Sequence, residues 1–104
     1  MTATVVVPTI VQKTYVPSTG MTGTPMRLVK YTFKFTKAYD GDWIVTATYF
    51  QAGTPLYWNA CVIDSSSNGV VEETDGIAYT SSGTTLAFQN STVGTVTGEI
   101  WFEE

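Results

Sequence analysis

The chain has 104 residues, a length typical of one domain, and 43% of them are hydrophobic, which excludes a wholly disordered protein. Only 13% are charged and the net charge is −4, which argues against nucleic-acid binding because phosphate contact needs a basic surface. There is no histidine and a single cysteine, Cys61, which excludes histidine-based catalysis, histidine-ligated zinc and an intrachain disulfide.

Threonine, rather than lysine or glutamate, is the most frequent polar residue. The chain has 19 threonines, against five lysines and arginines together. Threonine is β-branched and suits the pleated surface of a strand better than a helix, so the composition favours a β protein. The sequence shows no signal peptide and no apolar run long enough for a membrane span, so we expect a protein made in the cytoplasm.

The charged residues are separated along the chain. All nine acidic residues lie from Asp40 onward, and all five basic residues come before them: Lys13, Arg27, Lys30, Lys34 and Lys37. One interpretation is local pairing of a basic strand with acidic neighbours in the same fold. The other is that the basic segment meets the acidic face of a second copy, in a head-to-tail or ring assembly.

Residues 1–26 are predicted to form an extended arm, because prolines 8, 17 and 25 interrupt them and proline cannot donate to a strand ladder. Two apolar runs inside the arm are edge strands at best. They are too apolar to remain in water, so we expect them to lie along the domain or along a neighbour. The predicted interface residues of the arm are Val5, Val6, Val7, Ile10, Val11 and Tyr15.

Residues 29–36 alternate between apolar and polar side chains, which predicts a half-buried strand. Its inward row is Val29, Tyr31, Phe33 and Phe35. A turn at 38–42 contains Asp40-Gly41, the pair best suited to positive φ, and residues 43–50 are predicted to complete a hairpin. The inward row of this second strand would be Trp43, Val45, Ala47 and Tyr49.

Residues 56–63 are predicted to form a third strand, and both of its rows are mostly apolar. We therefore expect cover on both faces, with the N-terminal arm as a candidate cover. Further short strands are predicted at 70–74, 77–80, 84–89 and 95–102, separated by turns. The last of them places Trp101 on its outward row between Glu99 and Glu103, where it could anchor a subunit contact, stack on a sugar, or be covered by a loop.

Seven or eight short strands at regular spacing predict an all-β fold, an antiparallel β-sandwich or small barrel. The spacing does not separate a jelly-roll-like from an immunoglobulin-like arrangement. The expected organisation is the arm, residues 1–26, followed by a single β-sandwich domain, residues 27–104.

Carboxylates are the remaining candidates for chemistry: Asp40, Asp42, Glu72, Glu73 and Asp75. Pairs of them could act as in a glycosidase, but they lie almost all in predicted turns of a domain too small for a substrate cleft. They could also offer oxygens to calcium, although aspartate and glycine are simply the favoured residues of hairpin turns. We expect no enzyme activity, no metal and no cofactor.

With its N-terminal segment Thr2-Ala3-Thr4-Val5-Val6-Val7-Pro8 and its Thr/Val/Gly-rich composition, the chain resembles the small all-β accessory proteins of tailed-phage virions. The resemblance implies a structural protein of capsid decoration or of the tail, located in the virion. It implies a homo-oligomer bound to a capsid or tail protein, with no cofactor. From the acidic net charge and the absence of a long apolar run, we expect neither nucleic acid nor a membrane as partner. The alternatives are a carbohydrate-binding or adhesive, receptor-binding module using Trp101 and Tyr57, and a small enzyme or metal-binding domain.

Overall fold

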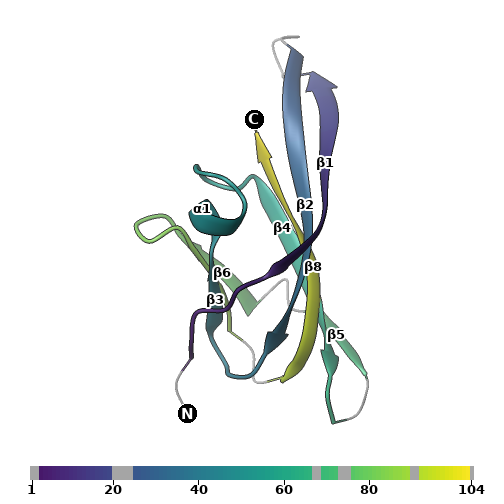
Figure 1. Ribbon diagram of the computed structural model, residues 1–104, viewed down its shortest axis with the longest axis vertical. Helices are drawn as coiled ribbons and strands as arrows, with labels where there is room; N and C mark the ends of the chain where they lie inside the picture. The colour runs from purple at the N-terminus through teal and green to yellow at the C-terminus, as the bar shows by residue number, and fades with distance from the viewer. Residues whose placement is uncertain (1–2, 20–24, 67–68, 73–75, 90–91, 104) are drawn as a thin grey trace.

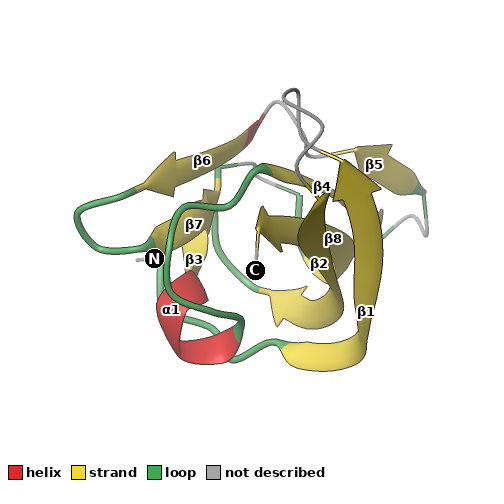
Figure 2. Cartoon of the chain, turned by 90° about the horizontal axis from the view of Figure 1, so that it is seen from above, coloured by secondary structure: helices red, strands yellow, loops and turns green. Residues whose placement is uncertain are grey.

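The computed structural model of the chain describes residues 3–19, 25–66, 69–72, 76–89 and 92–103. They form two antiparallel sheets and one helical turn, as the prediction of an antiparallel all-β fold required. Seen from above, the two sheets lie on opposite sides of the molecule (Figure 2).

The five-stranded sheet has the order β1-β2-β8-β4-β5, and the three-stranded sheet has the order β3-β7-β6 (Figure 1). In chain order the elements are β1 (Thr9–Thr19), β2 (Pro25–Lys37), β3 (Asp42–Val45), α1 (Thr46–Tyr49), β4 (Tyr57–Asp64), β5 (Val70–Glu72), β6 (Ile77–Thr80), β7 (Thr85–Phe88) and β8 (Gly94–Glu103).

The strands β2 and β8 are the centre of the larger sheet, and their alternation is the one predicted. The predicted inward row of β2, from Val29 to Phe35, is buried, and so is the inward row of β8 that ends at Ile100 and Phe102. The predicted strands at 77–80, 84–89 and 95–102 correspond to β6, β7 and β8 within one residue at each end.

The predicted hairpin between residues 29–36 and 43–50 is wrong. Strand β2 pairs with β1 on one side and β8 on the other, so neither of its edges is left for β3. The chain therefore crosses to the other sheet at the turn after Lys37, and β3 pairs with β7. The turn itself is where the sequence predicted it, with Gly41 at a φ of +89°.

The predicted inward row of residues 43–50 is also wrong, and the strand is shorter. The buried positions of β3 are Asp42 and Ile44, whereas Trp43 and Val45 are half-buried. The shift by one residue follows from Asp42, whose carboxylate turns inward to accept backbone N–H groups. After Val45 the chain makes the helical turn α1, so Ala47 and Tyr49 belong to no strand.

The second face of β4 is not covered by the described residues, contrary to the expectation from its two apolar rows. Tyr57 is 51% exposed and Ile63 is 42% exposed. The described part of the N-terminal arm does not cover this face, because β1 lies beyond β2 and β8, at the far side of the sheet from β4.

The core between the sheets is built around aromatic rings. Phe88 of β7 contacts Phe35 of β2 at 4.9 Å between ring centroids and Phe33 at 6.4 Å, which joins the two sheets. Phe50, directly after α1, packs against Tyr31 at 5.3 Å and Phe33 at 5.4 Å. The helical turn thus closes one end of the core, which the predicted continuous strand would have left open.

The N-terminal residues attach to both sheets. Residues 4–6 lie beside β3, where Val6 N–H donates to the Trp43 carbonyl at 2.8 Å and Trp43 N–H donates to the Thr4 carbonyl at 3.1 Å. The chain then crosses to the larger sheet and becomes its edge strand β1 (Figure 1). This agrees with the expectation that the apolar runs are at most edge strands; the division into arm and domain stays a prediction.

Gly98 allows β8 to lie close to its neighbours. A Cβ at this position would be 2.7 Å from the Asn59 carbonyl oxygen and 2.9 Å from the Phe33 ring. We expect Gly98→Ala to lower the free energy of unfolding by about 1–3 kcal/mol, the usual cost of overpacking. Urea denaturation measures this. The control is Gly83→Ala, because Gly83, like Gly98, has no positive φ, and an added methyl there would make only an ordinary 3.5 Å contact with Thr85, so the variant reports the cost of the change without overpacking.

Candidate functional site

Strand β1 carries three of the predicted interface residues, and all three are exposed. Val11 is 57% exposed, Tyr15 44% and Ile10 38%. The strand has 11 residues and, within the described part of the chain, pairs with β2 alone, so its other side is an edge of the sheet. Its register against β2 shifts between Ile10 and Gln12, which indicates a bulge at the start of the strand.

The predicted interface residues before β1 divide between surface and core. Val5 and Val7 are 52% and 69% exposed. Val6 is half-buried and packs against the core cluster, and Pro8 is buried. The segment is therefore fixed to its own domain through Val6 and presents its two neighbours to solvent.

Asp42 holds this segment in place. Its Oδ1 accepts a hydrogen bond from Thr4 N–H at 2.9 Å, and its Oδ2 accepts from Ala38 N–H at 2.9 Å and Tyr39 N–H at 3.1 Å. Burial would raise the pKa of this carboxyl, but the three backbone donors and the charge of Lys37 outweigh it and lower the pKa below its ordinary value. Asp42 is thus a buried anion that joins the N-terminal segment to the turn before β3.

Lys37 is the buried cation near this site. It is fully buried, and its Nζ donates to the Thr92 carbonyl at 2.8 Å. Lys37 also interacts electrostatically with Asp42, and Lys30 forms a 4.0 Å ion pair with Glu99, so both lysines have an acidic neighbour in the same chain. The separation of charges along the sequence partly reflects contacts inside the fold.

Two other basic residues gather around Tyr15. The Arg27 guanidinium lies 4.0 Å from the centroid of the Tyr15 ring, and Lys13 Nζ lies 5.2 Å from it. Lys13 Nζ is also 5.5 Å from the Tyr31 ring. The β1–β2 ladder, which extends along the longest axis of the molecule (Figure 1), therefore carries a basic and aromatic surface.

Trp101 lies on the outward row of β8, as predicted. It is half-buried, directly opposite Tyr57 on β4 and Lys30 on β2. Lys30 Nζ is 5.5 Å from the indole ring. The indole Nε1 is buried and has no hydrogen-bond partner among the described residues.

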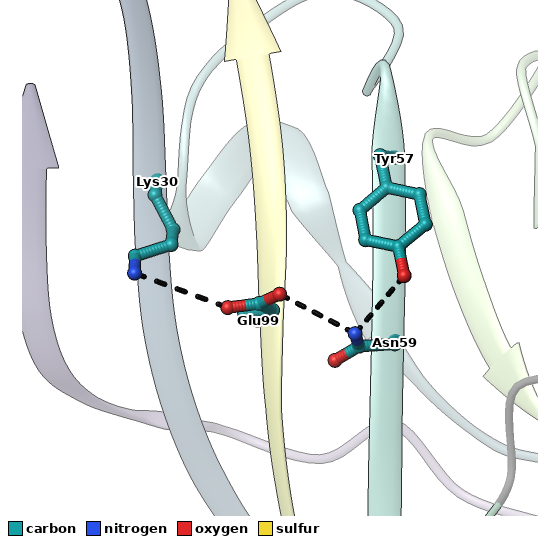
Figure 3. Close-up of polar contacts among 4 residues, drawn as sticks. All are labelled: Lys30, Tyr57, Asn59 and Glu99. Atoms are coloured by element: carbon teal, nitrogen blue, oxygen red, sulfur yellow. Dashed lines mark hydrogen bonds and ion pairs between the residues drawn. The ribbon is translucent and has the colours of Figure 1, made fainter. Parts of the chain in front are cut away.

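A row of polar side chains crosses the outer face of the larger sheet (Figure 3). By the strand register, the row lies beside Trp101. Asn59 Nδ2 donates to the Tyr57 hydroxyl at 3.1 Å and to Glu99 Oε1 at 3.3 Å. Glu99 in turn faces Lys30 through its other oxygen. The row spans three neighbouring strands, β2, β8 and β4.

A depression of about 450 Å³ lies beside this row, and we call it the outer trough. Asn59 and Glu99 form part of its wall. The other lining residues are Thr32, Ala60, Cys61, Thr97 and Gly98. The side chains that face it from the outward rows are short and uncharged, apart from Glu99.

Of the candidate carboxylates, Asp40 is exposed in the turn before β3 and Asp42 is buried. Among the described residues, no group of three histidine, cysteine, aspartate or glutamate side chains lies close enough together to hold a metal ion. Asp42 uses both oxygens on backbone donors, and Glu73 and Asp75 lie outside the described residues. Within the same residues, no helix is long and apolar enough to cross a membrane.

Sequence reasoning missed the polar row and the buried charges. Lys30, Asn59 and Glu99 are far apart in the sequence and meet only because β8 lies between β2 and β4. The alternation within each strand correctly places these three residues on outward rows. It does not indicate which strands are neighbours in the sheet, so their contact could not be predicted.

Comparisons of the chain with protein-family models, with curated proteins and with solved structures found no match.

Proposed function

We propose that the chain is a non-enzymatic structural subunit that associates with its own copies through the free edge of β1 and binds a larger protein shell. The observation that carries the proposal is the long edge strand with its exposed apolar residues Ile10, Val11 and Tyr15. An exposed edge presents unpaired backbone N–H and C=O groups that can pair with a strand of another molecule.

Two features limit where such pairing can occur. The register shift at Ile10/Gln12 interrupts the edge at one end, and Pro17, which has no backbone N–H, interrupts it at the other. Residues 12–16 form the regular part between them. A symmetric contact is therefore expected to centre on this short stretch.

The charges on β1 favour a pair of copies centred on Thr14 over one centred on Lys13. An antiparallel pair of copies centred on Lys13 would place the two ammonium groups opposite each other, which is unfavourable. A pair centred on Thr14 places Lys13 of each copy opposite Tyr15 of the other. This arrangement favours a cation–π contact of the kind already present within one chain.

The virion is the proposed setting, as a decoration or tail protein bound to a capsid or tail subunit. The support is the resemblance of the sequence to such accessory proteins, together with a two-sheet antiparallel fold. The finer fold class, a jelly-roll-like or immunoglobulin-like sandwich, belongs to the same proposal. A gene next to a major capsid or tail gene is expected; a gene among unrelated metabolic genes would speak against the setting.

Disulfide cross-linking tests the self-association and its register. In a Cys61→Ala background, Thr14→Cys is expected to form a covalent dimer under mild oxidation, because the two Cα atoms would lie about 4.5–5.5 Å apart. The matched control is Gln12→Cys, whose two copies would be roughly 14 Å apart in this register. Light scattering of the unmodified chain measures association independently.

The possible results test the proposed self-association and the proposed register separately. A strictly monomeric protein that forms no Thr14→Cys dimer contradicts the proposed function. An oligomeric protein that cross-links through Gln12→Cys instead contradicts only the register. Deletion of residues 1–25 is a poor test because it removes β1 and uncovers the edge of β2.

A further inference from the structure

An aromatic pair lies next to the outer trough, beyond the Asn59–Glu99 pair along the β4–β8 ladder and outside the residues that line the depression. Tyr57 and Trp101 are direct neighbours across the β4–β8 ladder, where opposed side chains have Cβ atoms about 4.5–5.5 Å apart. Tyr57 is 51% exposed, and Trp101 keeps part of its surface in solvent. Aromatic rings offer a large rigid apolar contact with a polar edge, which suits the C–H face of a sugar ring.

The polar groups beside this pair are held in fixed positions. Asn59 donates one hydrogen bond to Tyr57 and one to Glu99, so its amide orientation is set from two sides. The Tyr57 hydroxyl accepts one of these bonds and still has its own hydrogen to donate. Side chains that are already oriented lose less conformational freedom when a ligand binds.

The charge of the trough favours a neutral ligand. Among the described residues that line it, Glu99 alone is charged, and Lys30 lies 4.0 Å from that carboxylate. The two charges compensate each other, so the trough attracts neither anions nor cations strongly. An anionic ligand would be repelled by Glu99, and a cationic ligand would be repelled by Lys30. The remaining groups, including the Thr32 and Thr97 hydroxyls, are neutral donors and acceptors.

The Trp101 ring has no hydrogen bond to fix its orientation among the described residues, since its buried Nε1 donates to none of them. Packing and the ammonium group of Lys30 hold it instead. A ligand hydroxyl within hydrogen-bond distance of this nitrogen would supply the missing acceptor. An unsatisfied buried donor is a cost that such a ligand removes.

We propose that the outer trough binds a neutral oligosaccharide. One sugar ring lies against Trp101 and Tyr57, and the hydroxyls of this ring or the next contact Asn59 and Glu99. The site uses β2, β8 and β4 and leaves the free edge of β1 untouched. It is therefore independent of the proposed self-association, and either can be correct without the other.

NMR titration of the complete chain tests this site. The probes are four neutral pentasaccharides, cellopentaose, xylopentaose, maltopentaose and chitopentaose, and one anionic probe, penta-galacturonic acid. We expect at least one neutral probe to shift the Trp101 indole resonance and the backbone amides of Asn59, Thr97 and Glu99. Titration to about 10 mM detects dissociation constants of about 1 mM and tighter.

Variants then assign the contacts. Trp101→Ala and Asn59→Ala are each expected to weaken binding about tenfold, through loss of the ring contact and of the amide contacts respectively. Thr95→Ala is the matched control, because it lies on the same outward row of β8 but outside the trough, and it should bind normally.

If Trp101→Ala fails to fold, the NMR shifts of the unmodified chain still test the proposal, because they locate the bound ligand without a variant. Absence of shifts with every neutral probe overturns the proposal. So does binding of the anionic probe alone, or binding that maps to the β1 edge or survives both trough variants.

Discussion

Replacing Asp42 by alanine is expected to lower the free energy of unfolding by about 3–5 kcal/mol, as removal of one partner from a buried ionic contact usually does. The change leaves Lys37 as a buried cation and removes the acceptor of Thr4, Ala38 and Tyr39 N–H. Urea denaturation followed by tryptophan fluorescence measures the loss. Asp40→Ala is the control, since Asp40 is exposed in the same turn, and it should change the stability little.

The same carboxylate makes the stability depend on pH in a defined direction. The pKa of Asp42 is lower in the folded chain than its ordinary value of 3.8, so the unfolded chain takes up this proton first as the pH falls. Its contribution is complete above that value and is lost as the pH falls through the folded-state pKa. The stability difference between the unmodified chain and Asp42→Asn should therefore shrink below about pH 4. A difference that stays constant from pH 7 to about pH 2 would contradict this role of the charge.

Replacing Phe88 by alanine is expected to cost about 3–5 kcal/mol as well, the usual range for a buried phenylalanine. Its ring contacts Phe33 and Phe35 across the two sheets, so the cavity would open where the sheets meet. A loss of this size is a large share of the roughly 5–15 kcal/mol that typically stabilises a domain.

The matched comparison is Phe50→Ala. Phe50 is half-buried at the end of the core beside α1, where solvent and the short helical turn can adjust to a smaller side chain. We expect roughly half the cost of Phe88→Ala, by the same denaturation measurement. Equal losses would mean that the two rings contribute equally and that the end of the core is as rigid as its centre.

Strands whose pattern depends only on their own residues could be predicted. The alternation of β2 and β8 follows from apolar side chains at every second position, and both rows face the way the sequence indicated. Strand β3 could not be predicted in this way, because its phase is set by Asp42 and by donors from Thr4 and Ala38. A polar residue held inward by distant backbone groups leaves no periodic signal.

The other wrong predictions concerned which strands pair and which strand faces are exposed. The turn at Gly41 was placed correctly, yet the chain changes sheets there because β1 and β8 already occupy both edges of β2. The apolar outward row of β4 was expected to be covered, and the described part of the chain leaves Tyr57 and Ile63 exposed.

For the candidate sites too, features of a single strand could be predicted and features of strand pairing could not. The outward place of Trp101 could be inferred from its own strand, and so could the position of Tyr57 near the start of the strand predicted at 56–63. Their direct opposition, and the row through Asn59 and Glu99 to Lys30, depend on β8 lying between β2 and β4. That strand order is a long-range choice which sequence spacing does not specify.

The N-terminal segment connects the two sheets, since residues 4–6 pair with β3 while β1, which follows directly, pairs with β2. Its docking depends on Asp42, a group that loses its charge in acid. An assembly that grows from β1 would then be sensitive to acidification even though no titratable group need lie in the contact itself. Under the proposed self-association, the chain would therefore leave its assembly in a strongly acidic medium and remain in it near neutrality.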